Sequence, residues 1–481
     1  MMKQFLLTTV FFLTIFTLQA TDGYKIKVKI KGFEKDTIYL GYHYGEKQYL
    51  RDTTAKNAQG WFVFEGEKLL EPGMYLIVMP PDNKFFEILV NTDNQEFEVE
   101  TSYDKPADEM KVKNSQDNQI FYDYLHFIAS KRPEAEDLKK KIDEAGEDAA
   151  KKEPLEKKLE SINDEVKNYQ QNLLKKYPAS LTGAIIKGTF GLEYPEFKGT
   201  EEEINLQKWR YTVDHYFDNI DLRDDRLVRT SFLFQRIDYF VNKLTVQHPD
   251  SINRGLDYIL EKMDPKGENF KFYLVHFLNT FAKSNIAGMD AVYVHLVKKY
   301  YEKGLATWTD EETMKKILDN ANTLEPLLIG KIAPNIQMQK QDGTKLSLHD
   351  IQSPYTVMFF WDPECGHCKK AAPFMVEFDK KFKSKGVTIF SICTEFTEDV
   401  PKCWESIKEK EFTDFINVVD PYHRSKYKTI YDIKSTPQIY ILDSKKEILM
   451  KKIGAEQLGE VMDQIIKMGE EKKDPNKSSG K

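Results

Sequence analysis

Residues 359–370 read FFWDPECGHCKK, and this stretch decides the fold of the part of the chain that carries its chemistry. An apolar run ends at Trp361, and two cysteines separated by two residues follow, which predicts a buried strand that leads into a helix. Cys365 is then at the helix N-terminus, where free backbone N–H groups and the positive end of the helix dipole favour a thiolate. Cys368 lies one turn further on, in position to attack a mixed disulfide on Cys365.

The sequence around this stretch alternates between strands and helices from residue 327 to residue 470. Strands are expected at 355–361, 387–393, 415–419, 438–442 and 448–453. Helices are expected at 369–383, 400–410, 423–431 and from about 457. Asp342 and Gly343 predict a hairpin turn ahead of them. The alternation predicts an α/β domain with a central sheet sandwiched by helices.

Residues 21–115 have the short, closely spaced apolar segments of a β-rich domain. Residues 24–30 alternate with period two, so that apolar side chains share one face and lysines the other. Further strands are expected at 37–42, 61–64, 74–79, 85–90 and 96–101. Their spacing predicts a small antiparallel sandwich or barrel. Two roles stay open for this domain: a scaffold or docking domain, and a carbohydrate-like or partner-binding sheet.

Residues 116–326 are predicted to form an all-α domain. A heptad seam predicts an antiparallel helical hairpin, with a dimerising coiled coil as the alternative. The seam consists of Leu155, Leu159, Ile162, Val166, Tyr169 and Leu173. Further amphipathic helices are expected at 202–217, 226–244, 249–263, 269–283, 288–303 and 310–322. Their many aromatic residues predict a packed core, with a ligand groove as the alternative. The histidines of this domain lack the paired spacing of metal ligands, so we expect no metal and no cofactor.

The N-terminus has the pattern of a secretory signal peptide. Lys3 precedes an uncharged stretch from Phe5 to Leu18, and a cut after Ala20 would remove residues 1–20. An uncleaved membrane anchor is the alternative, although the stretch is shorter than the roughly 20 residues of a membrane span. No cysteine stands near the cut to carry a lipid. We therefore expect a periplasmic protein that is not a lipoprotein. Residues 471–481 are expected to be a disordered tail.

Length and charge narrow the class of protein further. A chain of 481 residues suggests about three domains at roughly 150 residues each. The net charge is −7, and the 31% of charged residues include both signs. A nucleic-acid surface would need a concentrated basic patch, so nucleic-acid binding is not expected. The oligomeric state is left open.

The remaining two cysteines, Cys393 and Cys403, are predicted to form a structural disulfide if the loop between them folds back. Two free buried thiols and a redox relay are alternatives. A zinc site built from Cys365, His367, Cys368 and one of these two is a further alternative.

The C-terminal part resembles the thioredoxin fold, and more closely the exported bacterial thiol-disulfide oxidoreductases of the reductase and cytochrome-maturation type. The resemblance covers residues 329–470. It depends on Phe360-Trp361, on Cys365-Gly366-His367-Cys368, on Pro373, and on Thr436-Pro437. The strand-rich and helical regions upstream also look like the N-terminal extensions of some exported members.

The resemblance implies roles for several of these residues. Pro437 in the cis form would face Cys365, and Thr436 would offer backbone groups to an extended peptide. Pro373 would bend the active-site helix. Gly366-His367 is the pair of protein disulfide isomerases, whose potential is near −180 mV, roughly 90 mV above that of thioredoxin. His367 would stabilise the Cys365 thiolate and make the disulfide more oxidising.

The chain also departs from the family pattern. Phe359 stands where thioredoxins place a buried acid beneath the disulfide, and Ala371 stands where several exported reductases place a glutamate. The resolving thiol of Cys368 therefore lacks both usual proton acceptors. Glu364 is expected to oppose the Cys365 thiolate, and the lysines at 369–370 to favour it.

Three functions remain as hypotheses. The first is a periplasmic thiol-disulfide oxidoreductase that reduces or isomerises disulfides of exported proteins, with Cys365 as nucleophile, Cys368 as resolving thiol and a membrane thiol donor or acceptor implied by the family. The second is a thiol peroxidase, although Asp362 stands where such enzymes have threonine. The third is a binding scaffold whose redox domain is vestigial.

Overall fold

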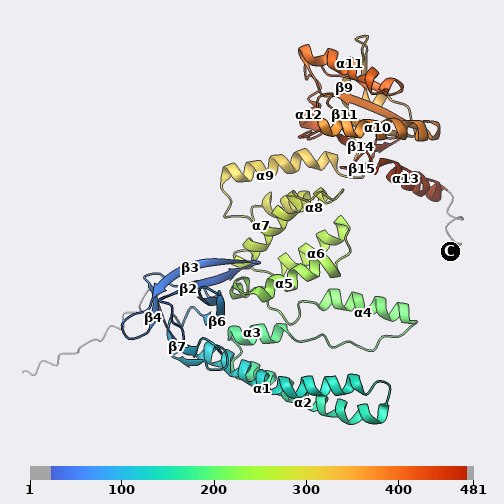
Figure 1. Cartoon of the computed structure of the whole chain (residues 1–481). Coiled ribbons are helices and arrows are strands. Elements are labelled where there is room, and N and C mark those ends of the chain that lie inside the picture. The colour runs from blue at the N-terminus through green and yellow to red at the C-terminus, as the bar shows by residue number, and fades with distance from the viewer. Residues whose placement is uncertain (1–22, 474–481) are drawn as a thin grey trace, which may run out of the picture. The chain divides into compact units, whose positions relative to one another are not determined.

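The computed structural model describes residues 23–473, with side chains up to residue 470. The predicted signal peptide, and the tail from residue 474 on, lie outside the described residues. The chain forms two compact units (Figure 1), each treated by itself below. The first contains residues up to 240 and 267–269, and the second contains residues 241–266 and those from 270 on.

The first unit begins with two open four-stranded sheets, in the strand orders β4-β1-β7-β8 and β3-β2-β5-β6. The strands are β1 (Tyr24–Lys31), β2 (Thr37–Tyr44), β3 (Lys47–Ala55), β4 (Phe62–Gly66), β5 (Gly73–Met79), β6 (Lys84–Val90), β7 (Glu96–Ser102) and β8 (Lys111–Lys113). Strands β1 and β7 pair in parallel, which corrects the purely antiparallel expectation. The other pairs in these sheets are antiparallel.

Helices α1 (Gln116–Glu144) and α2 (Ala149–Lys176) follow as a hairpin, which turns near Gly146 in the left-handed conformation with φ 57°. The predicted seam packs against α1 of the same chain, where the rings of Phe127 and Tyr169 stack at 4.0 Å. The hairpin predicted from the heptad pattern is therefore present. Shorter helices complete this unit: α3 (Leu181–Gly188), α4 (Glu201–His215), η1 (Asp225–Arg229) and α5 (Ser231–Tyr239).

Helices continue from residue 240 to residue 327. They are η2 (Phe240–Leu244), α6 (Pro249–Glu261), α7 (Glu268–Ala282), α8 (Asp290–Leu296), η3 (Val297–Tyr301), α9 (Glu311–Leu324) and η4 (Glu325–Leu327). Two of these helices, α8 and η4, form hydrogen bonds with the following α/β domain within the second unit. Lys451 of that domain donates to the carboxylate of Asp290 and to the backbone carbonyl of Leu327, and both charged side chains are buried.

A five-stranded sheet in the order β13-β12-β11-β14-β15 forms the centre of the α/β domain. Its strands are β11 (Tyr355–Trp361), β12 (Val387–Cys393), β13 (Ile416–Val418), β14 (Gln438–Asp443) and β15 (Ile448–Lys451). Strands β11, β12 and β13 are parallel, while β14 and β15 are antiparallel to their neighbours. A separate hairpin of β9 (Gln337–Gln339) and β10 (Lys345–Ser347) precedes it, turning at Asp342 and Gly343 as predicted.

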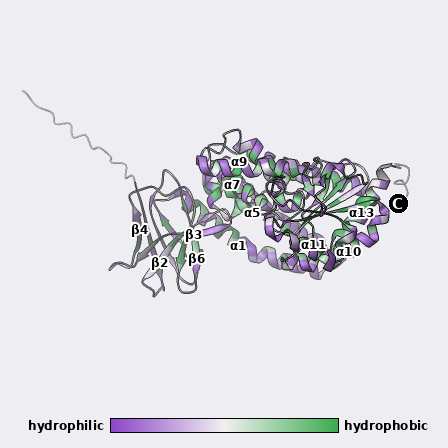
Figure 2. Cartoon of the chain, turned by 90° about the horizontal axis from the view of Figure 1, so that it is seen from above, coloured by the Kyte–Doolittle hydropathy of each residue, from purple (hydrophilic) through white to green (hydrophobic). Residues whose placement is uncertain are grey.

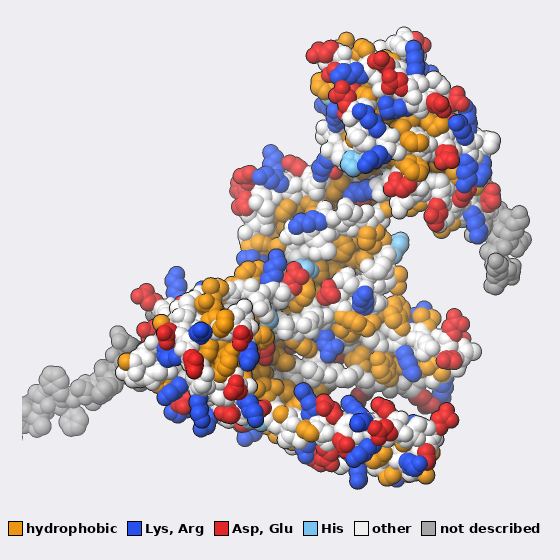
Figure 3. Space-filling model, in the orientation of Figure 1, with side chains coloured by type: hydrophobic (Ala, Val, Ile, Leu, Met, Phe, Trp, Pro, Cys, Tyr) orange, Lys and Arg blue, Asp and Glu red, His pale blue; other side chains and the backbone are white. Residues whose placement is uncertain are grey.

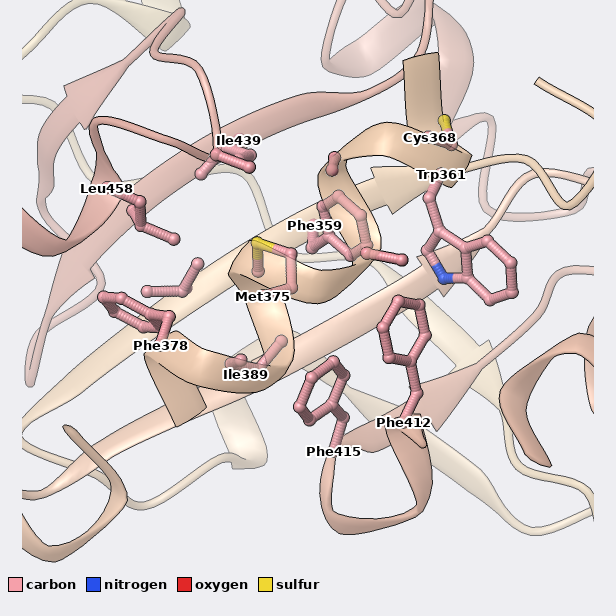
Figure 4. Packing of buried hydrophobic residues seen from close by; sticks show 14 of the residues in the cluster. Phe359, Trp361, Cys368, Met375, Phe378, Ile389, Phe412, Phe415, Ile439 and Leu458 are labelled. Carbon is pink, nitrogen blue, oxygen red and sulfur yellow. The ribbon is translucent and has the colours of Figure 1, made fainter. Parts of the chain in front are cut away.

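Helices cover the sheet, and the alternation of side chains along β11 gives it a hydrophobic core on each face. The helices are α10 (Gly366–Phe382), α11 (Val400–Glu409), α12 (Tyr427–Ile430) and α13 (Leu458–Lys473). Phe359 and Trp361 pack with α10, α11 and α13 on one face (Figure 4), while Met358 and Phe360 pack with α12 and the lead-in segment on the other. Figure 2 shows hydrophobic residues along these strands and hydrophilic ones on the surrounding helices. The multidomain fold with a C-terminal α/β domain is thus confirmed.

The prediction of a helix at 423–431 is wrong for its first residues, 423–426. The buried carboxylate of Asp420 accepts the backbone N–H groups of Arg424 and Ser425, and Lys426 takes a left-handed φ of 55°. These contacts hold a loop there, so only residues 427–430 remain helical. Within residues 23–473, no helix is both long and apolar enough to cross a membrane.

Candidate active site

The turn between β11 and α10 positions the first cysteine. Cys365 is the N-cap of α10 in an extended conformation, and its carbonyl accepts the N–H of Lys369 at 3.0 Å. The carboxylate of Asp362 accepts the N–H of Glu364 at 2.7 Å and that of Cys365 at 3.1 Å, which fixes the turn. The sequence analysis missed this role of Asp362, although an aspartate before a proline at a strand end is a turn signal.

The two thiols differ in exposure and in acidity. Cys365 is partly exposed, whereas the side chain of Cys368 is buried and its sulfur accepts the N–H of Asp362 at 3.5 Å. Burial raises the pKa of Cys368 to about 12. Partial burial also acts to raise the pKa of Cys365, but hydrogen bonds from the backbone of Cys368, from the side chain of Thr436 and from the backbone of His367 outweigh it and lower this pKa. Cys365 is therefore the thiol that ionises first.

A second loop lies against the Cys365 sulfur. The Thr436–Pro437 peptide bond is cis, and the thiol of Cys365 donates to the carbonyl of Thr436 at 3.3 Å. The loop is placed there by the sheet, because β14 begins at Gln438 beside Phe360 of β11. The structure thus brings together Cys365, Cys368, Thr436 and Pro437 from segments that are 71 residues apart in the sequence.

Trp361 packs in the hydrophobic core beneath the site and does not lie at the protein surface. Its ring is buried, its indole N–H donates to the hydroxyl of Ser391 at 2.8 Å, and Phe412 meets it edge-on at 5.4 Å. Figure 4 shows this ring below Cys368, with Phe359 to its left and Phe412 below it. Phe359 is fully buried as well, so the position that lacks an acid is filled by packing.

The residues between and around the cysteines are at the surface. Gly366 and His367 are exposed, and nothing lies within 4 Å of the place where a Cβ on Gly366 would stand. Glu364 was expected to oppose the Cys365 thiolate, but Lys402 donates to its carboxylate at 3.1 Å and partly neutralises that charge. Pro373 lies inside α10, one turn after Cys368.

Cys393 and Cys403 are bonded to each other, with their Cα atoms 6.1 Å apart. The predicted bond between these two cysteines is confirmed, and the alternatives of two free thiols and of a zinc site that uses one of them are wrong. Its structural role, as opposed to that of a redox relay, stays a prediction. Among the residues that the structure describes, no group of three or more His, Cys, Asp and Glu side chains is arranged to hold a metal ion. The disulfide connects the end of β12 to α11, close to the redox turn.

Three family models match successive parts of the chain. Residues 24–121 match a domain of unknown function, DUF4369, and residues 149–323 match another, DUF5106. Residues 329–450 match the AhpC/TSA family. The last match includes the dithiol turn, the disulfide and the Thr436-Pro437 loop.

Curated relatives and solved structures are similar to part of the chain. The thiol-disulfide oxidoreductase ResA of a Bacillus cereus strain is 29% identical over 130 residues, which is 27% of this chain and 72% of ResA. A solved domain of a possible thiol-disulfide isomerase from Cytophaga hutchinsonii is 36% identical, with 30% of this chain and 97% of that chain covered and a TM-score of 0.28. The redox domain, residues 329–450, is therefore that of a thioredoxin-fold thiol-disulfide oxidoreductase.

A further solved structure extends beyond the redox domain. The thioredoxin-like protein from Bacteroides caccae is 20% identical, covering 57% of this oxidoreductase and 97% of that chain with a TM-score of 0.35. The peroxidase alternative is not favoured. In this oxidoreductase the residue three before Cys365 is Asp362, whose carboxylate is engaged in fixing the turn.

Proposed function

We propose that this enzyme is an exported, periplasmic thiol-disulfide oxidoreductase that reduces or isomerises disulfides of exported proteins. The observation that carries the proposal is the arrangement at Cys365: a partly exposed sulfur at a helix start, 3.3 Å from the Thr436 carbonyl, with the buried thiol of Cys368 one turn behind it. Cys365 can therefore react with a substrate, while Cys368 stays buried until it attacks the mixed disulfide.

The first chemical step is attack by the Cys365 thiolate on one sulfur of a substrate disulfide. A new S–S bond forms between the substrate and Cys365, the substrate S–S bond breaks, and the released sulfur takes up a proton. The lowered pKa of Cys365 increases the fraction of thiolate relative to an ordinary thiol. The backbone groups of Thr436 are placed to bind the main chain of the substrate beside the reacting sulfurs.

The second step releases the substrate. Cys368 loses its proton, its sulfur attacks that of Cys365, and the mixed disulfide breaks, so that the second substrate sulfur leaves and is protonated. The substrate has gained two electrons and two protons, and the enzyme holds a Cys365–Cys368 disulfide. A thiol donor then has to reduce the enzyme again, and the resemblance to exported reductases suggests a membrane-bound one. Isomerisation results when a substrate thiol, instead of Cys368, resolves the mixed disulfide.

Reduction of insulin by the mature chain tests the reaction. The wild-type enzyme should reduce insulin disulfides with dithiothreitol as donor, while Cys365→Ser should be inactive and Cys368→Ser should accumulate a mixed disulfide. Activity that persists in Cys365→Ser would contradict the proposed mechanism. Cell fractionation tests the location: mature protein that lacks residues 1–20 in the periplasmic fraction supports it, and full-length protein in the cytoplasm contradicts it.

A further inference from the structure

Two loops lie next to the redox turn and are tied to it by backbone contacts. The loop 394–399 follows β12, and the N–H of Thr394 donates to the carbonyl of Trp361 at 2.9 Å. The loop 420–426 precedes α12, where the hydroxyl of Tyr427 donates to the carbonyl of Thr394 at 3.3 Å. Both loops are thus anchored at the end of β11, from which the turn to Cys365 departs.

Aromatic rings and cations cover the outer surface of these loops. The ring of Phe396 is 44% exposed and that of Tyr422 is 66% exposed. The Phe396 and His423 rings lie 4.6 Å apart, the Lys428 ammonium lies 5.5 Å from the centre of the Phe396 ring, and the Arg424 guanidinium lies 5.0 Å from that of Tyr422. We call these five residues, Phe396, Tyr422, His423, Arg424 and Lys428, the aromatic–cation platform.

A disulfide and a backbone hydrogen bond connect the loops that carry the platform. The Cys393–Cys403 disulfide closes the loop that carries Phe396. The N–H of Thr397 donates to the carbonyl of Pro421 at 2.9 Å, which joins the two loops. Thr397 has a φ of 47° and His423 a φ of 50°, left-handed conformations that cost free energy in residues other than glycine. Such strain persists where the surroundings fix it, and it concentrates at sites of binding.

Acidic residues lie around the redox turn and the start of the loop 394–399. Partial burial, and then the charges of Asp362, Asp399 and Glu364, raise the pKa of Glu395, which places it in the acidic surroundings of the redox turn. Lys402 pairs with two of these acids, Glu364 and Asp399. Within residues 23–470, neither Arg424 nor Lys428 forms an ion pair. The cations of the platform are therefore available to an external carboxylate.

We propose that the aromatic–cation platform binds the part of the substrate polypeptide next to the cysteine that Cys365 attacks, and selects a segment with an aromatic and an acidic side chain. This inference rests on the proposed function and names the substrate class of the same site. Thr436 binds the main chain without regard to sequence, whereas exposed rings gain from covering an aromatic side chain, and the neighbouring cations gain from a carboxylate. The platform supplies the sequence preference that the Thr436 loop lacks.

The test uses two synthetic peptides of equal length with one intramolecular disulfide each. Phe-Asp follows the second cysteine in one peptide, and Ser-Lys follows it in the other. Hydroxyethyl disulfide, which has no flanking residues, measures the dithiol chemistry alone. The full-length wild-type enzyme should have a kcat/KM about tenfold higher for the Phe-Asp peptide, and the double variant Y422S/R424E should lose this preference while it reduces hydroxyethyl disulfide at the wild-type rate.

A matched control changes the same kinds of side chain elsewhere on the domain. The double variant K467E/M468S on α13 reverses one exposed charge and removes one exposed apolar side chain, and it should keep the wild-type preference. Equal rates for the two peptides, a preference for the Ser-Lys peptide, or an unchanged preference in Y422S/R424E would overturn the inference and leave the proposed function standing. Failure of the wild-type enzyme on all three disulfides would overturn the proposed function and this inference with it.

Discussion

Hydrogen bonds, more than charges, set the acidity of the attacking thiol. Burial acts against ionisation of Cys365, and hydrogen bonds from the backbone N–H groups at the start of α10 and from the side chain of Thr436 outweigh it. Of the two acidic residues in the turn, Glu364 is paired with Lys402, and Asp362 accepts the N–H groups of Glu364 and Cys365. The thiolate is therefore stabilised by donors that the helix start provides, in a region where four N–H groups have no partner within the helix.

Two substitutions at His367 separate the contribution of its backbone N–H to the pKa of Cys365 from that of its imidazole ring. His367→Pro removes the ring and the backbone N–H, so the pKa of Cys365 should rise, the reduced form should lose stability, and the reduction potential should fall towards the thioredoxin value, by up to about 90 mV. His367→Ala keeps the N–H and should shift the potential less. Equilibration of both variants with glutathione measures the potentials. An unchanged potential in His367→Pro would show that these donors do not control the thiol.

At the scale of elements, a buried ion pair joins the sheet to the helices within the second unit. Lys451 of β15 and Asp290 of α8 are both almost completely buried, and Lys451 also donates to the carbonyl of Leu327. Burial lowers the pKa of Lys451, although the charge of Asp290 opposes this effect. Such a pair holds its elements in one arrangement, but its net stabilisation is small because both charges have lost their water.

Removal of one partner of the Lys451–Asp290 ion pair should lower the free energy of unfolding far more than removal of both. Asp290→Ala leaves a buried cation without its counter-charge, and we expect a loss of about 3–5 kcal/mol in the local free energy of unfolding. The double variant D290L/K451M should be close to wild type. Hydrogen exchange of the β15 amides measures the change. Equal protection in Asp290→Ala and wild type would mean that the pair is not formed in solution.

The disulfide should contribute to stability mainly through the loop it closes. With 10 residues of separation, the loss of Cys393–Cys403 in the double variant C393A/C403A should cost about 3 kcal/mol by the chain-entropy model. The effect should appear as faster hydrogen exchange in α11 and in loop 394–399. Wild-type protection there would contradict a structural role. Reduction of hydroxyethyl disulfide should be retained, because Cys365 and Cys368 are not part of this bond.

Regular elements with a buried face were predictable from the sequence, and the loops around the site were not. Strand β1 alternates between buried and exposed positions and was predicted, whereas β3 is mostly exposed, shows no alternation and was missed. The dithiol, Thr436 and Pro437 were found from their motif. The platform depends on contacts between distant segments, such as that of the Thr397 N–H with the Pro421 carbonyl, which leave no local sequence pattern.

At the scale of the whole molecule, the C-terminal part contains the redox site, and two further parts of unknown role precede it. The match to the AhpC/TSA family covers residues 329–450, and the matches to two domains of unknown function precede it. On the face seen in Figure 3, basic and acidic side chains are intermingled, in keeping with the net charge of −7 and without the basic surface of a nucleic-acid-binding protein.

Alkylation of the reduced full-length protein with iodoacetamide across pH, followed residue by residue by mass spectrometry, tests the central claim most directly. The account predicts that Cys365 reacts first, with a midpoint below the value of about 8.5 for an ordinary thiol, since its pKa is lowered and reaction requires the thiolate. Cys368, whose pKa is raised to about 12 by burial, should stay unmodified until the protein is unfolded. Reaction of Cys368 as fast as Cys365, or a midpoint for Cys365 at or above that of an ordinary thiol, would contradict it.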